Sequence, residues 1–249
     1  MSEPKFFVLI IGTEILNRRR KDAHFDFVTQ ALANKGHKLT GSFIIEDDPA
    51  LIVQTIKFIA SQSNPVLFSF GGIGSTPDDY TRKCVAIALK DGQLPIHEEA
   101  KKIIEDKLGE NAYPHPIKMA ELQKGAKLLH NPVNKTPAFS LDERYYFMPG
   151  FPEMSHPMVN EILEKLIPNK KEQYRYTLTA LCKENIFIEV MEKMPKEVEF
   201  SSLPKLYNDG WKVTISVASD NEKAAKEAFA LYIEILEKKK IIYALVDEA

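Results

Sequence analysis

The sequence predicts an α/β fold with a mostly parallel sheet, followed by a separate small α+β domain. Over the first ninety residues or so, short apolar runs of the kind found in strands buried on both faces alternate with segments of helical spacing. A polar segment, 168–173, then sets off a C-terminal part. That part has the expected order β-α-β-β-α-β, which suggests a split, ferredoxin-like sandwich.

The first six elements are expected to alternate between strand and helix. The apolar run 6–11 ends at Gly12 and is typical of a buried strand. The segment 23–35 has apolar residues at helical spacing, and Gly36 stands where a helix C-cap belongs. The next elements are expected to be a strand at 39–45, a helix at 49–61, a strand at 66–70 and a helix at 80–89. This alternation indicates right-handed βαβ units in a layered structure.

The order of elements changes after residue 90. We expect a helix at 98–108, a proline-rich loop at 111–116, short strands at 127–130 and 145–148 with a turn-rich segment between them, and a helix at 152–167. The domains are therefore expected at 1–168 and 174–249. In the second domain we expect strands at 176–181, 198–200, 211–218 and 241–246, helices at 185–194 and 222–240, and a turn at 208–210.

Length and charge narrow the function classes. The 249 residues suffice for a good core. Lys and Arg number 33 against 35 Asp and Glu, which argues against broad electrostatic binding of nucleic acid. Cys84 and Cys182 lie far apart and have no metal-ligand spacing, which fits a reduced, cytoplasmic setting. No apolar run reaches the length of a membrane span, so we expect no membrane segment.

The segment 71–79, GGIGSTPDD, is the strongest functional signal. It joins a buried strand to a helix, which is the order that a phosphate site needs: glycines let backbone N–H groups approach an anion, and the helix N-terminus adds positive charge. Asp78 and Asp79 would repel a bare phosphate, so their presence suggests a divalent cation between them and the ligand. The alternative is a tight turn with Asp78 as an N-cap.

A second loop is expected at the same place. Ligands of doubly wound sheets bind beyond the carboxyl ends of the strands, where the strand order reverses. If the strand at 39–45 lies outside the first strand, that point lies between the first and third strands. The loop of Gly12, Thr13 and Glu14 would then face the loop at 71–76. Glu14 is expected either to bind a metal or position a water, or to complement a helix dipole.

Two further groups of charged residues lie near these loops. Asp48 precedes Pro49 and is expected to cap a helix, which leaves Asp47 to face the crevice and, with Asp79, to hold a Mg²⁺-like ion. The basic run 18–21, RRRK, is interpreted either as an anchor for a diphosphate or as a solvated loop.

Four segments of the chain carry a family resemblance: GTEIL at 12–16, GGIGSTPDDYTR at 71–82, NPV at 131–133 and MPGFPEM at 148–154. Together they resemble the molybdopterin-binding (MoaB/Mog-like) superfamily, and 71–82 resembles its GGxGPTxDDxT signature. The closest branches are competence/damage-inducible protein A (CinA) and the N-terminal domain of eukaryotic FAD synthases. Residues 12–16, GTEIL, resemble the G-[DT]-E-[IL]-L of that branch, and 131–133 and 148–154 resemble its NPxGTAPG and [LM]PGxPxEM segments. The C-terminal part resembles the small domain that follows in CinA-type proteins by element order alone.

The resemblance implies a three-layer α/β/α sandwich that binds molybdopterin-like or nucleotide-like ligands through the glycine loop, and assembly as a dimer or trimer. In the CinA branch it implies metal-dependent hydrolysis of ADP-ribose-like dinucleotides, and in the FAD-synthase relatives cleavage of FAD. Two other readings remain open: a transferase of molybdenum cofactor assembly that adenylylates molybdopterin, and a non-catalytic pterin- or nucleotide-binding module.

The resemblance also implies roles for individual residues. Asp79, Asp47 and Glu14 would be catalytic, and Asp47 and Asp79 would bind Mg²⁺, Mn²⁺ or Co²⁺. The ligand would be bound by Gly12, Thr13, Gly71, Gly72, Gly74, Ser75, Thr76, Thr81, Pro149 and Gly150, with Thr81 bracing the loop. The sequence departs from the family pattern at Ser75 (proline in the family), Arg18 (glycine), His24 (asparagine) and 134–138, where NKTPA replaces GTAPG.

Overall fold

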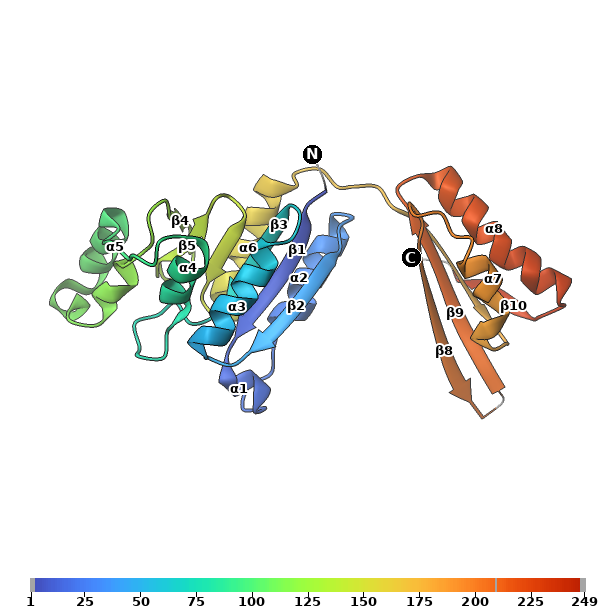
Figure 1. Cartoon of the computed structure of the whole chain (residues 1–249), viewed down its shortest axis with the longest axis horizontal. Coiled ribbons are helices and arrows are strands. Elements are labelled where there is room, and N and C mark those ends of the chain that lie inside the picture. Colours follow the sequence, from blue (N-terminus) through green and yellow to red (C-terminus); the bar gives the residue numbers. More distant parts are fainter. Residues whose placement is uncertain (1–2, 209, 247–249) are drawn as a thin grey trace. The chain divides into compact units, whose positions relative to one another are not determined.

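The computed structural model describes residues 3–208 and 210–246, and it divides the chain into two compact units (Figure 1). The first unit is Met1–Lys170 and the second is Lys171–Ala249. Each unit has a hydrophobic core of its own.

The first unit is built on a six-stranded, mostly parallel sheet in the order β2-β1-β3-β6-β5-β4. The strands are β1 (Lys5–Ile11), β2 (Leu39–Ile45), β3 (Pro65–Phe70), β4 (Lys127–Leu129), β5 (Ala138–Leu141) and β6 (Tyr145–Met148). The four strands β2, β1, β3 and β6 run parallel, whereas β5 and β4 continue the sheet with antiparallel pairing. Strand β1 therefore lies between β2 and β3, which is the order under which the loops after β1 and β3 were expected to meet.

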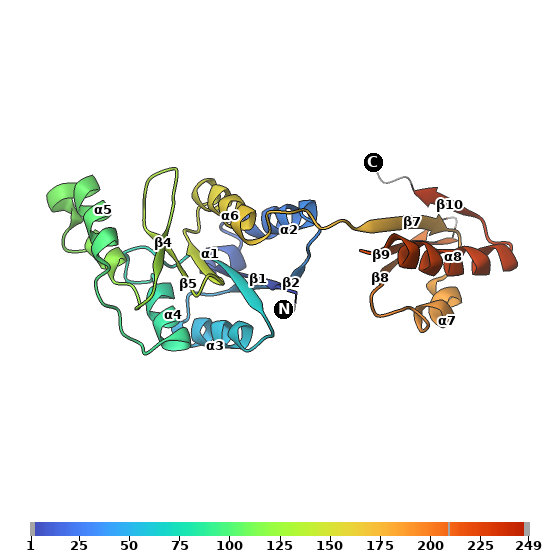
Figure 2. The ribbon, with the colours of Figure 1, turned by 90° about the horizontal axis from the view of Figure 1, so that it is seen from above.

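Helices cover both faces of this sheet (Figure 2). Helices α2 (His24–Asn34) and α6 (Pro152–Leu166) pack together on one face, and α3 (Pro49–Ala60) and α4 (Thr81–Leu89) pack together on the other. All residues of β3 are buried, which is the pattern expected for a strand between two helical layers. The predicted three-layer α/β/α architecture is confirmed.

Local sequence signals explain where several helices begin and end. The Asp48 carboxylate accepts a hydrogen bond from the Leu51 N–H at 2.7 Å, and Pro49 occupies the first turn, so α3 begins as predicted. Gly36 follows α2 with a φ of 72°, the left-handed backbone that ends many helices. The one-turn helix α1 (Thr13–Leu16) follows β1 directly. Helix α5 (Glu98–Leu108) packs against two short 3₁₀ helices, Gly109–Ala112 and Pro116–Ala120.

Two expectations for the first unit need correction. The segment expected to be turn-rich contains the buried strand β5, whose four residues are too few for a periodic pattern to identify. The proline-rich loop expected at 111–116 is shared between the ends of the two 3₁₀ helices, because short local turns can form around a proline. The other element boundaries of this unit lie within a residue of the expected ones.

The second unit is an antiparallel sheet in the order β10-β7-β9-β8. Its strands are β7 (Tyr174–Ala180), β8 (Glu199–Tyr207), β9 (Gly210–Ser219) and β10 (Tyr243–Val246), and helix α8 (Glu222–Lys238) packs against β7 and β9. The first strand of the unit lies beside the third and fourth, which is the order of a ferredoxin-like split sandwich. The α+β prediction for this unit is confirmed.

Two elements of the second unit differ from expectation. The helix expected at 185–194 is a 3₁₀ turn, Glu184–Phe187, followed by the four-residue α7 (Ile188–Met191). The strand expected at 198–200 extends to Tyr207, because it pairs with β9 along its whole length. Leu203 and Leu206 in this strand are exposed and break the alternating pattern of apolar and polar residues. Residue 209 of the expected turn lies outside the described residues. Within residues 3–208 and 210–246, every helix is too short or too polar to cross a lipid bilayer.

Candidate functional site

Three loops begin at the carboxyl ends of neighbouring strands β1, β3 and β6. The Gly71 N–H donates to the Met148 carbonyl at 3.0 Å, and a Cβ placed on Gly150 would lie 3.3 Å from the Gly71 Cα. A Cβ on Gly71 itself would collide with the carbonyl oxygen of Ile11, and the φ of Gly71 is 101°. The three loops therefore pack backbone against backbone, which a larger residue at position 71 would prevent.

Thr81 ties the glycine loop to the first turn of α4. Its hydroxyl donates to the Gly71 carbonyl at 2.9 Å, and its N–H donates to the Gly72 carbonyl at 2.9 Å. The Thr81 side chain is completely buried. These two bonds fix the backbone of both glycines relative to the helix.

Asp79 closes the loop on itself. Its Oδ2 accepts hydrogen bonds from the Thr76 N–H at 2.8 Å and the Thr76 hydroxyl at 2.5 Å. A Cβ on Gly74 would lie 2.6 Å from the same oxygen. The residue before α4 is Tyr80, and no side-chain hydrogen bond caps this helix. The alternative reading, in which Asp78 serves as an N-cap, is therefore wrong.

Asp47 has the same arrangement at the end of β2. Its Oδ2 accepts from the Thr13 N–H at 2.9 Å and the Thr13 hydroxyl at 2.8 Å. Asp47 thus faces the loop after β1, while Asp48 turns away to cap α3. The Oδ1 atoms of Asp47 and Asp79 accept no hydrogen bond from the described part of the chain. One oxygen of each carboxylate is therefore fixed by hydrogen bonds, and the other is available to a ligand.

Glu14 folds back over the start of its own loop. A Cβ on Gly12 would lie 2.8 Å from the Glu14 Oε2. The Arg20 guanidinium lies 4.0 Å from the Glu14 carboxylate and 5.3 Å from the centre of the Phe151 ring. Arg20 therefore connects the loop after β1 to the loop after β6 by an ion pair and a cation–π contact.

The donor set fits a metal site that a ligand completes. Among the described residues, no three His, Cys, Asp or Glu side chains are grouped so that they could hold an ion by themselves. Mg²⁺ is commonly bound by one or two carboxylates together with phosphate oxygens of the ligand and water, and Mn²⁺ accepts the same oxygen donors. Asp47 and Asp79, each with a spare oxygen, match that mode of binding.

Arg82 is a site residue that the sequence did not reveal. Its side chain is buried, its Nη2 donates to the Gly74 carbonyl at 2.7 Å, and its Nη1 donates to the Lys118 carbonyl. Arg82 thereby joins the glycine loop to the 3₁₀ helix Pro116–Ala120. Burial lowers its pKa from the usual value. An arginine in the first turn of a helix is ordinarily solvated, so no pattern in the sequence indicates this contact.

His24 is the second unexpected residue near the loops. Its ring stacks on Phe70, the residue before Gly71, with a centroid distance of 4.2 Å, and meets His156 edge-on at 5.4 Å. Its Nε2 lies 3.4 Å from the Gly150 carbonyl oxygen. Burial lowers the pKa of His24 to about 4, so the ring is neutral at neutral pH.

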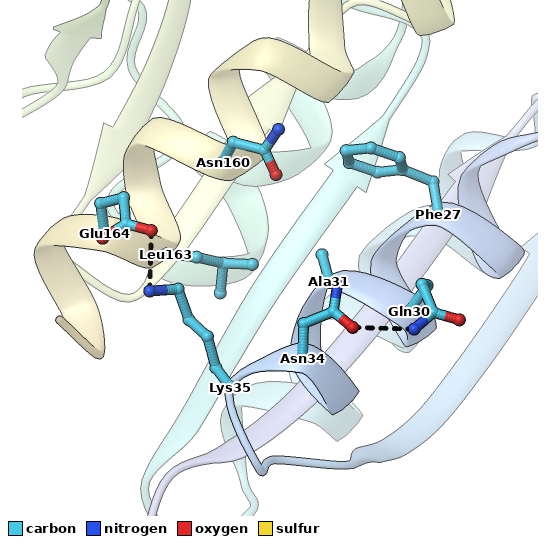
Figure 3. A pocket seen from close by; sticks show the side chains of 8 residues that line it. All are labelled: Phe27, Gln30, Ala31, Asn34, Lys35, Asn160, Leu163 and Glu164. Carbon is cyan, nitrogen blue, oxygen red and sulfur yellow. Dashed lines mark hydrogen bonds and ion pairs between the residues drawn. The ribbon is translucent and has the colours of Figure 1, made fainter. Parts of the chain in front are cut away.

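Two hollows of the first unit lie away from these loops. A groove of about 320 Å³ runs between α2 and α6, where Lys35 pairs with Glu164 at 2.8 Å and Gln30 bonds Asn34 at 2.9 Å (Figure 3). The other, of about 490 Å³, lies between β4 and α6 and contains Lys127 and Glu161. Neither hollow is lined by any residue predicted for the site.

Comparisons with known proteins agree with this architecture. Residues 7–169 match the family model described as "Probable molybdopterin binding domain". A CinA-like protein from Sulfurihydrogenibium sp. (strain YO3AOP1) is 24% identical over 98% of this chain and 64% of its own length. A protein from Archaeoglobus fulgidus is 27% identical over 95% of this chain and its whole length.

A comparison with solved structures gives a match in both sequence and fold. The crystal structure of the protein CinA, of unknown function, from Thermoplasma acidophilum has a TM-score of 0.58 and 27% identity, and the match covers 66% of this chain and 99% of that one. A relative from Bacillus pumilus, described as a "Putative competence-damage inducible protein", matches over 42% of its own length. The chain therefore spans less than half of that relative. The family model covers well over half of this chain. The chain therefore belongs to the molybdopterin-binding domain family and is of the CinA type.

Proposed function

We propose that the first unit is a metal-dependent nucleotide pyrophosphatase that acts on ADP-ribose-like or FAD-like dinucleotides. One observation carries the proposal. Asp47 and Asp79 are each fixed by the N–H and hydroxyl of a threonine beside a glycine loop, and each keeps an oxygen for a metal. Because Mg²⁺-type ions bridge carboxylates and phosphate oxygens, this arrangement suits a diphosphate ligand.

In this reaction, different residues of the site would bind the phosphate, hold the metal and orient the water. N–H groups of the loop 71–76 donate to a phosphate and stabilise the charge that develops on it. Asp47 and Asp79 would hold the metal, which would supply positive charge to the diphosphate and lower the pKa of a bound water. Glu14 orients the attacking water from the neighbouring loop. Thr81 keeps the loop backbone in place by its bond to Gly71.

Membership of the molybdopterin-binding family supports a pterin or nucleotide as the ligand. The same cradle would serve an adenylyltransferase for molybdopterin, which also needs an ATP site. A third candidate, a non-catalytic binding module, is favoured by one feature. In the segment that replaces the family's glycines, the Asn134 side-chain Oδ1 accepts from the Asn131 Nδ2 at 2.9 Å and from the Thr136 N–H at 2.9 Å, so this loop is held by its own side chains.

The test is phosphate release from ADP-ribose and from FAD, measured with a coupled phosphatase in Mg²⁺, Mn²⁺ or Co²⁺. We expect turnover that needs the metal and is lost in Asp79→Ala. Asp78→Ala is the matched control, because it removes the adjacent exposed carboxylate, which also interacts with the Thr76 side chain, and leaves both hydrogen-bond donors of Asp79 in the chain. Folded protein that turns over neither substrate in any of the three metals would reject the pyrophosphatase. Release of diphosphate from ATP in the presence of molybdopterin would point to the transferase instead.

A further inference from the structure

Arg18 has a strained backbone at the end of α1. Its φ is 61°, in the left-handed region that favours glycine. The Arg18 N–H donates to the Ile15 carbonyl at 3.1 Å, and the Arg19 N–H donates to the Glu14 carbonyl at 2.9 Å. This pair of bonds is the Schellman motif, and Arg18 occupies its left-handed position, where glycine is the usual residue.

The side chain of Arg18 makes no polar contact with the described residues that would offset this strain. Arg18 is exposed, and its guanidinium makes no hydrogen bond or ion pair with the described residues. Non-glycine residues in this backbone region are strained, and such outliers cluster at active sites and ligand clamps.

The loop that carries Arg18 lies beside the glycine loop. Arg20, two residues after Arg18, contacts the Phe151 ring. Phe151 follows Gly150, and the backbone of Gly150 packs against Gly71. Arg18 also follows Glu14 by one helical turn, on the loop whose Thr13 holds Asp47. These contacts place the loop that carries the Arg18 backbone at the rim of the same site, on the side of β1.

We infer that Arg18 forms a second anion subsite, which takes the outer phosphate of a ligand whose other phosphate is bound by the loop 71–76. The inference rests on the proposed function only in requiring that this loop binds a phosphate. A guanidinium can hold a phosphate through two parallel hydrogen bonds, which gives the site a preference for diphosphates over monophosphates. The ligand class is thus a nucleoside diphosphate or its ester.

The test compares binding of AMP and ADP, each with Mg²⁺, by calorimetry in the full chain. Arg18→Gly is expected to weaken ADP binding about tenfold, the effect of losing one charge-assisted contact, and to change AMP binding less than about twofold. The same variant relieves the backbone strain, so its Tm is expected to rise by about 2–4 °C. Arg18→Asn, which tolerates left-handed backbone and has no charge, should weaken ADP binding in the same way.

Arg19→Gln is the matched control, because it removes the same charge one residue away at a position without positive φ. It should lower ADP affinity less than about twofold. If Arg18→Gly and Arg18→Asn bind ADP as tightly as the wild type, or weaken AMP and ADP equally, the second subsite is wrong while phosphate binding by the loop stands. If the wild-type chain binds neither AMP nor ADP, the proposed function fails together with the subsite.

Discussion

The N–H and the hydroxyl of Thr13 both donate to one oxygen of Asp47, at 2.9 and 2.8 Å. Thr76 and Asp79 repeat the arrangement in the glycine loop. Two donors on one oxygen restrain the rotation of each carboxylate. The site therefore has two anionic groups whose orientation is set by the loops before any ligand binds.

Asp79→Asn should separate the charge of this residue from its role in the loop. The amide oxygen can still accept from Thr76, so the Tm should stay within about 2 °C of the wild type. Affinity for Mn²⁺ in the presence of ADP-ribose should fall at least about tenfold, because a carboxylate ligand is lost. Electron paramagnetic resonance titration of free Mn²⁺ and thermal denaturation give the two readouts. Unchanged Mn²⁺ affinity would remove Asp79 from the metal site.

Alanine at three glycines should have three different effects. Gly71→Ala should cost about 3 kcal/mol, since its Cβ meets the backbone oxygen of Ile11 at a φ of 101°. Gly125→Ala should cost only about 1 kcal/mol, because its φ is 86° but the space around it is open. Gly74→Ala should displace Asp79, whose Oδ2 is 2.6 Å from the added carbon.

Urea denaturation and Mn²⁺ affinity, measured on all three variants, distinguish these effects. Gly74→Ala is expected to lose metal affinity at a stability cost of about 1–2 kcal/mol, since the Asp79 carboxylate must break its two hydrogen bonds with Thr76 to move aside. If Gly74→Ala kept its metal affinity and Gly125→Ala lost it, the link between Gly74 and Asp79 would be disproved.

Much of the sheet could be predicted, because strands that are buried on both faces have uninterrupted apolar sequences. The uninterrupted apolar run of β1 and the helical spacing of α3 each have one natural interpretation, and the structure confirms both within a residue or two. The strand β5 could not be found in this way, since its four residues fit several structures and only the pairing with β4 and β6 decides. The extent of β8 was missed for the opposite reason: it is long but mostly exposed, and its partner β9 determines it.

Arg82→Lys should loosen both segments that the guanidinium joins. Lysine keeps the charge but cannot reach the Gly74 and Lys118 carbonyls together, so about 2 kcal/mol of stability should be lost. Amide hydrogen exchange should become faster in the loop 71–76 and in the 3₁₀ helix Pro116–Ala120 at the same time. Arg144→Lys, at an exposed arginine that bonds Asn64, is the control and should leave both segments unchanged. Faster exchange in one segment alone would mean that Arg82 does not couple them.

The site was predictable to the extent that it follows from local backbone chemistry. The glycine positions and the capping role of Asp48 depend on neighbours in sequence, and the structure has the predicted cap. Arg82 and His24 act through residues far away in the chain, Lys118 and Gly150, so no spacing in the sequence indicates their contacts. The functional roles of Asp47, Asp79 and Glu14 stay predictions.

His24 should make the stability of the first unit depend on pH. Its pKa is about 4 in the folded chain, against 6.5 for an unperturbed histidine, because burial against Phe70 and His156 disfavours the charged form more than Asp22 favours it. The unfolded chain therefore binds more protons than the folded one between these values, and stability is lost as the pH falls from 6.5 towards 4. The loss should reach about 3 kcal/mol.

The measurement is the free energy of unfolding in urea at intervals from pH 7 to pH 4, for the wild type and for His24→Asn. Carboxylates also titrate in this range, and His156 has a lowered pKa of its own, so the difference between the two curves isolates His24. We expect that difference to shrink by about 3 kcal/mol as the pH falls, whereas His115→Asn, at an exposed histidine, should follow the wild type throughout. Parallel curves for wild type and His24→Asn would mean that the buried ring takes up its proton without cost, and the stacking of His24 on Phe70 would then have to open in acid.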